Sequence, residues 1–395
     1  MPLNAVLRHL RPDSLPMTTA AQPGSSQPEH GTSSAASAPG DCATGRGRRV
    51  LVTGGAGFIG SHLIERLIAR GDSVVVVDDL STGRRSNLNG IDPARLTFLQ
   101  MTVLEALAGP DPRLDGRFDE VYHLAAAVGV DLILQRPIES IETNVMETAR
   151  LLRFAALHAT PTLIASSSEV YGKSDRVPFR EDDDVVYGPT IAARWSYACS
   201  KAIDEYLGLA HFYEDHLPVA IARLFNTVGP RQVGRYGMVL PRFVAAALDG
   251  RPLQVFGDGH QARSFCDVRD VVRVLPQLVA NSHCHGQVFN VGHDEAITIV
   301  DLAHTVIRVL ASSSTVELVP YETAYPGRGF EDLRTRCPDL TRLRGATGFA
   351  PAYALDTTIR DLARQIEADR DRAGAAATVA DRPCGDAMTD EHMPR

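Results

Sequence analysis

The chain of 395 residues is long enough for one large α/β domain or two smaller ones. Its content of 44% hydrophobic and 22% charged residues is typical of a soluble globular protein. The net charge of -8 argues against a surface that binds nucleic acids or anionic membranes, because both repel an acidic protein.

Short β-branched runs alternate with segments of helical period through residues 47–368. Candidate strands are Arg49–Thr53, Ser73–Asp78, Leu96–Leu99, Glu120–Leu124, Thr162–Ser166, Val219–Arg223 and Val288–Val291. Candidate helices are Ile59–Ala69, Pro137–Leu157 and Ser196–Glu214. This order predicts an α/β fold, a Rossmann-type doubly wound parallel sheet with a smaller C-terminal lobe.

Three glycines follow the first strand and precede the first helix. Gly54, Gly57 and Gly60 allow a tight turn and let the backbone approach a pyrophosphate at the helix N-terminus. Asp78, at the end of the second strand, is placed to accept hydrogen bonds from ribose hydroxyls. A carboxylate at this position repels a 2′-phosphate. The sequence therefore predicts a site for NAD rather than NADP.

A tyrosine and a lysine lie one helical turn apart at positions 197 and 201. An ammonium beside a phenol favours the phenolate, so Tyr197 is a candidate general base whose pKa Lys201 lowers toward working pH. Such a pair also occurs by chance on exposed helices. Ser167, at the carboxyl end of a predicted strand where ligands bind in such sheets, favours the catalytic interpretation because it can hydrogen-bond the same hydroxyl.

These motifs, in this order, resemble the extended short-chain dehydrogenase/reductases of the NAD-dependent epimerase/dehydratase family. The similar blocks cover nearly the whole body and include T-G-G-A-G-F-I-G at 53–60, V-D-D-L-S-T-G at 77–83, H-L-A-A-A at 123–127, S-S-S-E-V-Y-G at 166–172, Y-A-C-S-K at 197–201, R-L-F-N-T-V-G-P-R at 223–231 and G-D-G-H-Q-A-R-S-F at 257–265. The resemblance implies that Tyr197 takes a proton from the sugar 4-hydroxyl while NAD accepts the C4 hydride. It adds these residues to the cofactor site: Phe58, Ile59, Leu124, Ala125 and Ala126.

The resemblance implies three fates for the resulting 4-keto sugar: epimerisation, dehydration or decarboxylation. Ser168 stands where dehydratases carry an acidic residue, and Glu169 departs from the simple epimerases. Both positions look like UDP-glucuronate decarboxylases, and Arg336 matches a catalytic arginine of that group. Decarboxylation of UDP-glucuronate is therefore our first expectation, with a UDP-glucuronate or UDP-glucose 4-epimerase second and an NDP-glucose 4,6-dehydratase third.

The same resemblance implies roles for polar residues around the sugar and the UDP. Arg336, or a water ordered by Ser168 and Glu169, could reprotonate C5, and Arg194 and Arg336 could orient the carboxylate. Further substrate-binding candidates are Asn226, Arg231, Arg235, Gln261 and Arg263. The acidic residue that members of this family often use to hold adenine is replaced by Thr102.

Motif positions and composition divide the chain. We expect a disordered extension at 1–46, an NAD-binding Rossmann domain at 47–230 to which 260–292 returns, a substrate-binding lobe at 231–259 and 293–368, and a disordered tail at 369–395. Six scattered cysteines indicate reduced thiols in the cytoplasm and no metal site. The partners expected are a UDP-sugar substrate and, by resemblance, a second copy of the chain in a homodimer.

Overall fold

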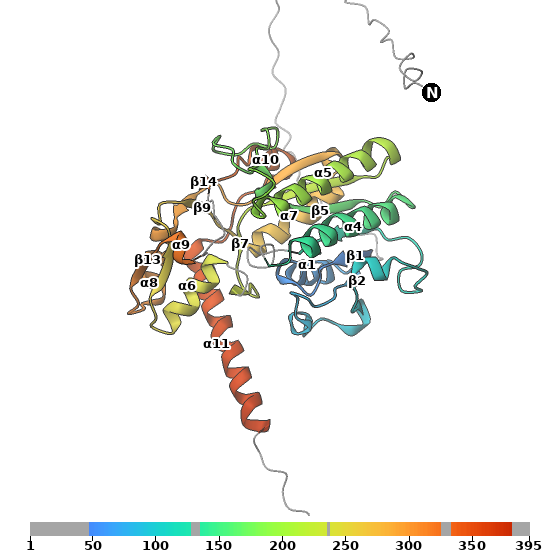
Figure 1. Ribbon diagram of the computed structural model, residues 1–395. Coiled ribbons are helices and arrows are strands. Elements are labelled where there is room, and N and C mark those ends of the chain that lie inside the picture. Colours follow the sequence, from blue (N-terminus) through green and yellow to red (C-terminus); the bar gives the residue numbers. More distant parts are fainter. Residues whose placement is uncertain (1–46, 128–134, 235–237, 325–332, 381–395) are drawn as a thin grey trace, which may run out of the picture. The chain divides into compact units, whose positions relative to one another are not determined.

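The computed structural model describes residues 47–127, 135–234, 238–324 and 333–380 (Figure 1). Seven parallel strands form the central sheet in the order β11-β6-β5-β4-β1-β2-β3. Their bounds are β1 (Arg49–Thr53), β2 (Ser73–Val77), β3 (Leu96–Leu99), β4 (Glu120–His123), β5 (Thr162–Ser167), β6 (Val219–Leu224) and β11 (Gln287–Val291). The strands are mostly buried because both faces of a parallel sheet are covered. The doubly wound sheet predicted from the sequence is confirmed, with each strand within one residue of its predicted bounds.

Helices cover both faces of this sheet (Figure 1). On one face α1 (Phe58–Ala69) packs against α7 (Val268–Ala280), and their apolar sides form a core with β1, β2 and β11. On the other face α4 (Pro137–Ala156) packs along α5 (Arg194–Asp215). The short helix α2 (Val103–Ala106) contacts α4. This arrangement brings α5, which carries Tyr197, onto β5, which ends at Ser167.

A smaller lobe follows the sixth strand. It contains α6 (Val239–Leu248), α8 (Ile299–Leu310) and α11 (Leu355–Ala380), which share a separate apolar core. Its strands are β8 (Leu253–Phe256), β9 (Ala262–Ser264), β12 (Ala296–Thr298), β13 (Val316–Val319) and β14 (Thr335–Arg336). The remaining short elements are β7 (Thr227–Val228), β10 (Cys266–Asp267), α9 (Tyr321–Ala324) and α10 (Thr341–Thr347). The lobe sheet has the order β12-β9-β14, which places Arg336 beside Arg263.

The boundaries expected from composition differ from the structure in three places. Strand β9 belongs to the lobe sheet although it lies inside 260–292. Leu340, Leu343 and Phe349, expected in the lobe, pack into the Rossmann core through α10. Helix α11 continues past residue 368, so the prediction of a disordered tail from 369 is wrong for residues 369–380. The segments 1–46 and 381–395, which we expect to be disordered, lie outside the described residues.

Ion pairs hold the extended part of α11. Asp369 lies 3.8 Å from the guanidinium of Arg84, in the loop that follows β2, and Arg370 lies 2.9 Å from Asp249. Earlier on the helix, Gln365 accepts a hydrogen bond from the backbone of Arg231. The helix thus contacts the cofactor side of the fold as well as the lobe. Within the described ranges, no helix is both long and apolar enough to cross a bilayer.

Candidate active site

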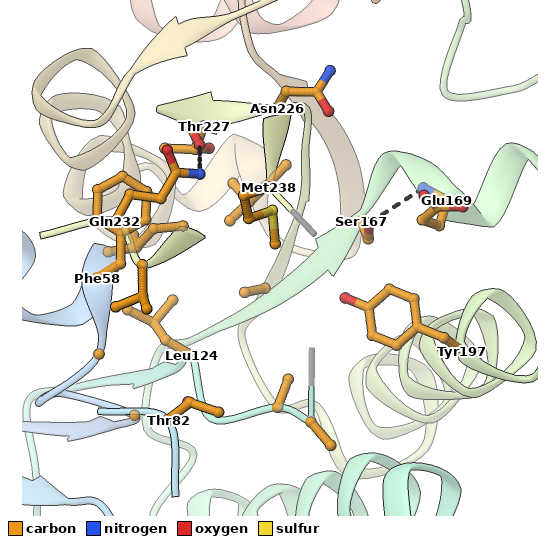
Figure 2. Close-up of a pocket in the computed structure, with 18 of the residues that line it drawn as sticks. Phe58, Thr82, Leu124, Ser167, Glu169, Tyr197, Asn226, Thr227, Gln232 and Met238 are labelled. Atoms are coloured by element: carbon orange, nitrogen blue, oxygen red, sulfur yellow. Dashed lines mark hydrogen bonds between the residues drawn. The ribbon is translucent and has the colours of Figure 1, made fainter. Parts of the chain in front are cut away.

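A cleft of about 1010 Å³ lies at the carboxyl ends of the parallel strands, between the sheet and the lobe (Figure 2). Its walls include every residue predicted to bind the cofactor: Gly54, Gly57, Phe58, Ile59, Gly60, Asp78, Leu124, Ala125, Ala126, Tyr197 and Lys201. They also include the predicted residues Ser167, Ser168, Glu169, Arg194, Asn226, Arg231, Gln261, Arg263 and Arg336. Arg235 lies outside the described residues. The structure therefore brings the described candidates into one cleft, as Rossmann-type sheets do at the ends of their strands.

The glycine turn is closed so tightly that two positions exclude a side chain. Gly54 has φ +69°, and a Cβ there would lie 2.6 Å from the backbone nitrogen of Ala125. A Cβ on Gly60 would lie 2.2 Å from the carbonyl oxygen of Gly54. The N-cap residue of α1 is Gly57, which has no side chain to cap the helix, so the first backbone N–H groups can bind a phosphate. This geometry fits a dinucleotide pyrophosphate.

Asp78 holds the turn as well as facing the cleft. One carboxylate oxygen accepts the backbone N–H of Ala56 at 2.8 Å, and the other accepts that of Leu80 at 2.8 Å. Burial raises the pKa of Asp78, and these backbone donors oppose that rise. Each oxygen retains a lone pair for a ribose hydroxyl. The residues present therefore fit NAD.

Tyr197 and Ser167 both line the cleft. Figure 2 shows the Tyr197 hydroxyl pointing into the cleft on the side of Ser167. Tyr197 is 8% exposed. Burial raises the pKa of its phenol, although Lys201 and a hydrogen bond with Ser167 act in the opposite direction. The prediction of a net lowering is therefore wrong for the protein alone, because desolvation of the phenolate exceeds the effect of the ammonium.

Lys201 has a buried counter-charge that the sequence analysis missed. Its Nζ donates to Asp204 Oδ2 at 3.0 Å, and both side chains are almost completely buried. Burial alone would lower the pKa of Lys201, but Asp204 reverses this and the net shift is upward. Asp204 thus keeps the lysine protonated beside Tyr197.

A chain of hydrogen bonds around His123 connects the end of β1 to α4. The imidazole Nδ1 lies 2.8 Å from Thr53 Oγ1, and Nε2 lies 3.0 Å from Thr148 Oγ1. Thr148 donates its proton to the carbonyl oxygen of Asn144 at 2.7 Å, so the network assigns the ring proton to Nε2. Burial lowers the pKa of His123 to about 3, and Lys201 adds to this shift. The imidazole is therefore neutral and serves as a fixed link between the glycine turn and the α4 face.

Removing the carboxylate of Asp204 is expected to destabilise the fold, because it leaves a buried ammonium without its counter-charge. We expect Asp204→Ala to reduce the free energy of unfolding by about 3–5 kcal/mol, measured by chemical denaturation. The double variant Lys201→Met/Asp204→Leu removes both charges and should recover most of the loss. A cost for Asp204→Ala below about 1 kcal/mol, the value typical of exposed pairs, would contradict the buried-pair interpretation.

Glu169 lies among three arginines, close to Tyr197 and Ser167. Its Oε1 accepts from Arg336 at 2.7 Å, and its Oε2 lies 3.9 Å from Arg194. Burial would raise the pKa of Glu169, but Arg336, Arg194 and Arg263 lower it to about 2. Glu169 is thus ionised at neutral pH, and this end of the cleft keeps an excess of positive charge. The Nε of Arg336 is buried and has no hydrogen-bond partner among the described residues.

The candidates for UDP binding have different environments. Asn226 donates to the backbone of Ser264 at 2.9 Å, and Gln261 donates to that of Phe256 at 2.8 Å, so both side chains also brace the lobe. Arg263 is 7% exposed and donates to its neighbour Ala262. Arg231 forms an ion pair with Glu65 of α1 through one terminal nitrogen of its guanidinium. All four side chains line the cleft.

Three further groups bearing on the site were not found from the sequence. Asp204 and Thr148 lie on helix faces that become internal only because α4 and α5 pack together. Phe256 lines the lobe wall, with the guanidinium of Arg242 at 4.2 Å from its ring centre. No local motif marks these residues, because their positions depend on contacts between distant elements.

The chain is similar to known proteins over most of its length. Residues 50–292 match the model of the NAD dependent epimerase/dehydratase family. A UDP-N-acetyl-alpha-D-glucosaminuronate decarboxylase of Bacillus cytotoxicus is 38% identical over 326 residues, which cover 82% of this chain and 99% of the relative. UDP-glucuronic acid decarboxylase 2 of Arabidopsis thaliana is 33% identical, over 85% of this chain and 72% of the relative.

A solved structure also matches. The UDP-N-acetylglucosamine 4-epimerase from Methanobrevibacter ruminantium M1, in complex with UDP-N-acetylmuramic acid, aligns with a TM-score of 0.73 and 26% identity. The alignment covers 82% of this chain and 99% of that structure.

Proposed function

The chain belongs to the NAD-dependent epimerase/dehydratase family, and from this premise we propose that it oxidises C4 of a UDP-linked hexuronate with NAD and releases the 6-carboxylate as CO2. Relatives named as decarboxylases of UDP-linked sugar uronates match most of this chain. UDP-glucuronate and its 2-acetamido counterpart are the two substrates that these relatives indicate.

The observation that carries this proposal is the charge at the sugar end of the cleft. Arg336 and Arg263 are nearly buried there, and Arg194 lies close by with a single acidic side chain, Glu169, between them. A guanidinium binds a carboxylate in a bidentate manner, and Arg336 lines the cleft beside Glu169. A neutral hexose offers no charge to match this arrangement, whereas a hexuronate does.

The opening step needs a base at the sugar hydroxyl. Bound NAD supplies an acceptor for the C4 hydride. The Tyr197 oxygen takes the hydroxyl proton, and Ser167 orients the hydroxyl by a hydrogen bond. Lys201 provides the positive charge that favours the phenolate, and its buried pair with Asp204 fixes its position. Because Tyr197 is protonated in the protein alone, its proton must leave before the step.

The 4-keto group makes the 6-carboxylate a β-keto acid. The C5–C6 bond breaks, CO2 leaves, and the electron pair forms an enolate delocalised onto the C4 oxygen. A proton then adds to C5, from Arg336 or from a water held by Ser168 and Glu169. The carboxylate of Glu169 repels that of the substrate and so opposes excessive stabilisation of the ground state by the arginines.

The test is incubation of the purified protein and NAD with each uronate, followed by mass spectrometry of the nucleotide sugar. We expect the product to lose the mass of CO2 where NADH returns the hydride to C4, and the mass of CO2 plus two hydrogens where the 4-keto pentose leaves first. The second candidate is a 4-epimerase, as the similar solved structure is named, and it would leave the mass unchanged and invert C4. Unchanged mass with both substrates would reject the decarboxylase.

We also propose a homodimer formed through α4 and α5. The outer face of these helices exposes large apolar side chains: Ile138 is 72% exposed, Met146 52% and Tyr206 69%. A cluster of this kind on paired helices is suited to burial against a second copy. Light scattering should give twice the mass of the chain, and Tyr206→Asp should shift the distribution toward monomer. A monomeric wild-type protein would reject this assembly.

A further inference from the structure

Glu147 of α4 is a buried carboxyl group that the steps above do not use. It is 6% exposed and lines the cleft together with Met101, Thr102 and Val103. Among the described residues, no basic side chain forms an ion pair with it. Arg150, one turn further along α4, instead donates to the backbone oxygen of Leu107 at 3.0 and 2.7 Å. Burying a carboxyl group costs free energy unless the group forms hydrogen bonds.

The strand order fixes what lies beside this carboxyl group. A dinucleotide has its pyrophosphate at the turn after β1 and its adenosine ribose at Asp78 after β2, so its adenine extends toward the end of β3. There the cleft is lined by the apolar side chains of Met101, Val103 and Ala125, which suit the faces of a purine. Glu147 lies at the same end, close enough to the start of α2 to interact with the N–H groups of Val103 and Leu104.

Thr102, the other polar side chain there, is already engaged. Its hydroxyl donates to Glu105 Oε2 at 2.9 Å and accepts the backbone N–H of Glu105 at 3.1 Å, which together cap the N-terminus of α2. Two acidic groups, Asp79 and Glu105, act electrostatically on Glu147. Burial, with these two neighbours, raises the pKa of Glu147 to about 7. In either protonation state its carbonyl oxygen can accept a hydrogen bond.

We propose that Glu147 recognises the adenine of the cofactor by accepting a hydrogen bond from its 6-amino group. The inference rests on the proposed use of NAD and deepens it by adding a residue that selects the base. The carboxyl group thus takes the acceptor role that the threonine at 102 leaves open.

The test is calorimetric binding of two dinucleotides at pH 8: NAD, and its analogue in which hypoxanthine replaces adenine. The analogue has a carbonyl oxygen in place of the 6-amino group, so an ionised Glu147 repels it. We expect the wild-type protein to bind NAD about tenfold more tightly or better. Glu147→Ala should weaken NAD binding and bring the two affinities close together.

Two variants separate base recognition from a structural role. Glu147→Gln carries an amide that can turn to accept from an amino group or donate to a carbonyl, so it should keep NAD affinity and bind the analogue more tightly than wild type. Glu142→Ala removes an exposed charge from the same helix and should leave the wild-type preference intact. If Glu147→Ala does not fold, the glutamine variant alone carries the test.

The two possible failures are distinguishable because binding is measured without turnover. A wild-type preference for adenine that survives unchanged in Glu147→Ala or Glu147→Gln overturns the role of Glu147 and leaves the use of NAD intact. A wild-type protein that binds neither dinucleotide overturns both.

Discussion

Replacing Tyr197 with phenylalanine is expected to lower kcat by about 10²–10⁴-fold, the usual contribution of a positioned acid–base group. The substitution removes the phenolic oxygen that takes the sugar proton and leaves the buried ring in place. NAD binding, measured by calorimetry, should change little because the glycine turn and Asp78 are untouched. The rate of CO2 release from the uronate substrate is the measurement.

Tyr213→Phe is the matched control for this change. Tyr213 lies on the same helix, is 69% exposed and does not line the cleft. It should keep the wild-type rate. A Tyr197→Phe protein that retains most of the wild-type turnover would show that another group removes the proton.

The pH dependence of kcat/KM tests the lysine separately. Lys201 lowers the pKa of Tyr197, so its removal should raise that pKa and move the acid limb of the profile to higher pH. Lys201→Met is best combined with Asp204→Asn. The second change removes the carboxylate that would otherwise remain buried without a counter-charge. Asp204 has a smaller and opposite effect on Tyr197, so the upward shift should persist. An unmoved limb would separate Lys201 from the titration of the base.

Replacing Arg336 with methionine is the second change for which we expect a large loss. Arg336 is 6% exposed, contacts Glu169 and lines the cleft. Without it the cleft loses the cation that orients the substrate carboxylate and balances charge at the developing enolate. We expect kcat to fall by about 10²–10³-fold, the range found when one preorganised donor is removed. UDP affinity, measured by calorimetry, should stay near the wild-type value because Arg263 remains.

Arg334→Met is the control for Arg336. Arg334 lies two residues earlier, is 77% exposed at its side chain and pairs at 3.6 Å with the exposed Asp258. Glu169→Gln should also reduce turnover before it reduces UDP affinity. Because Glu169 and Arg336 are in contact, the double variant should lose less than the sum of the two single losses in activation free energy. Strict additivity would mean that the two residues act independently.

Much of the fold could be predicted because local and global signals agree. At β1 and α1 the apolar strand, the glycine spacing and the helical period all indicate one structure, and the structure has it there. Ser167 and Tyr197 were found because ligands bind at the ends of parallel strands, which relates a strand end to a distant helix.

Properties that depend on burial between segments distant in the sequence could not be predicted from the sequence alone. An Asp three residues after a lysine is usually solvated, and only the packing of α4 on α5 turns Asp204 into a buried counter-charge. The same packing determines the pKa of Tyr197, since residue spacing shows the lysine but not the desolvation of the phenol. The segment after residue 368 is rich in alanine and charged residues, which is compatible with either a loose tail or an exposed helix.

The reach of α11 has a practical consequence for producing the protein. A chain shortened at residue 368 would lose Asp369 and Arg370, which anchor the helix to the loop bearing Arg84 and to Asp249. A purification tag fused there would end beside the loop that follows the second strand. An expression boundary placed beyond residue 380 keeps the whole helix and its contacts with Arg84 and Asp249.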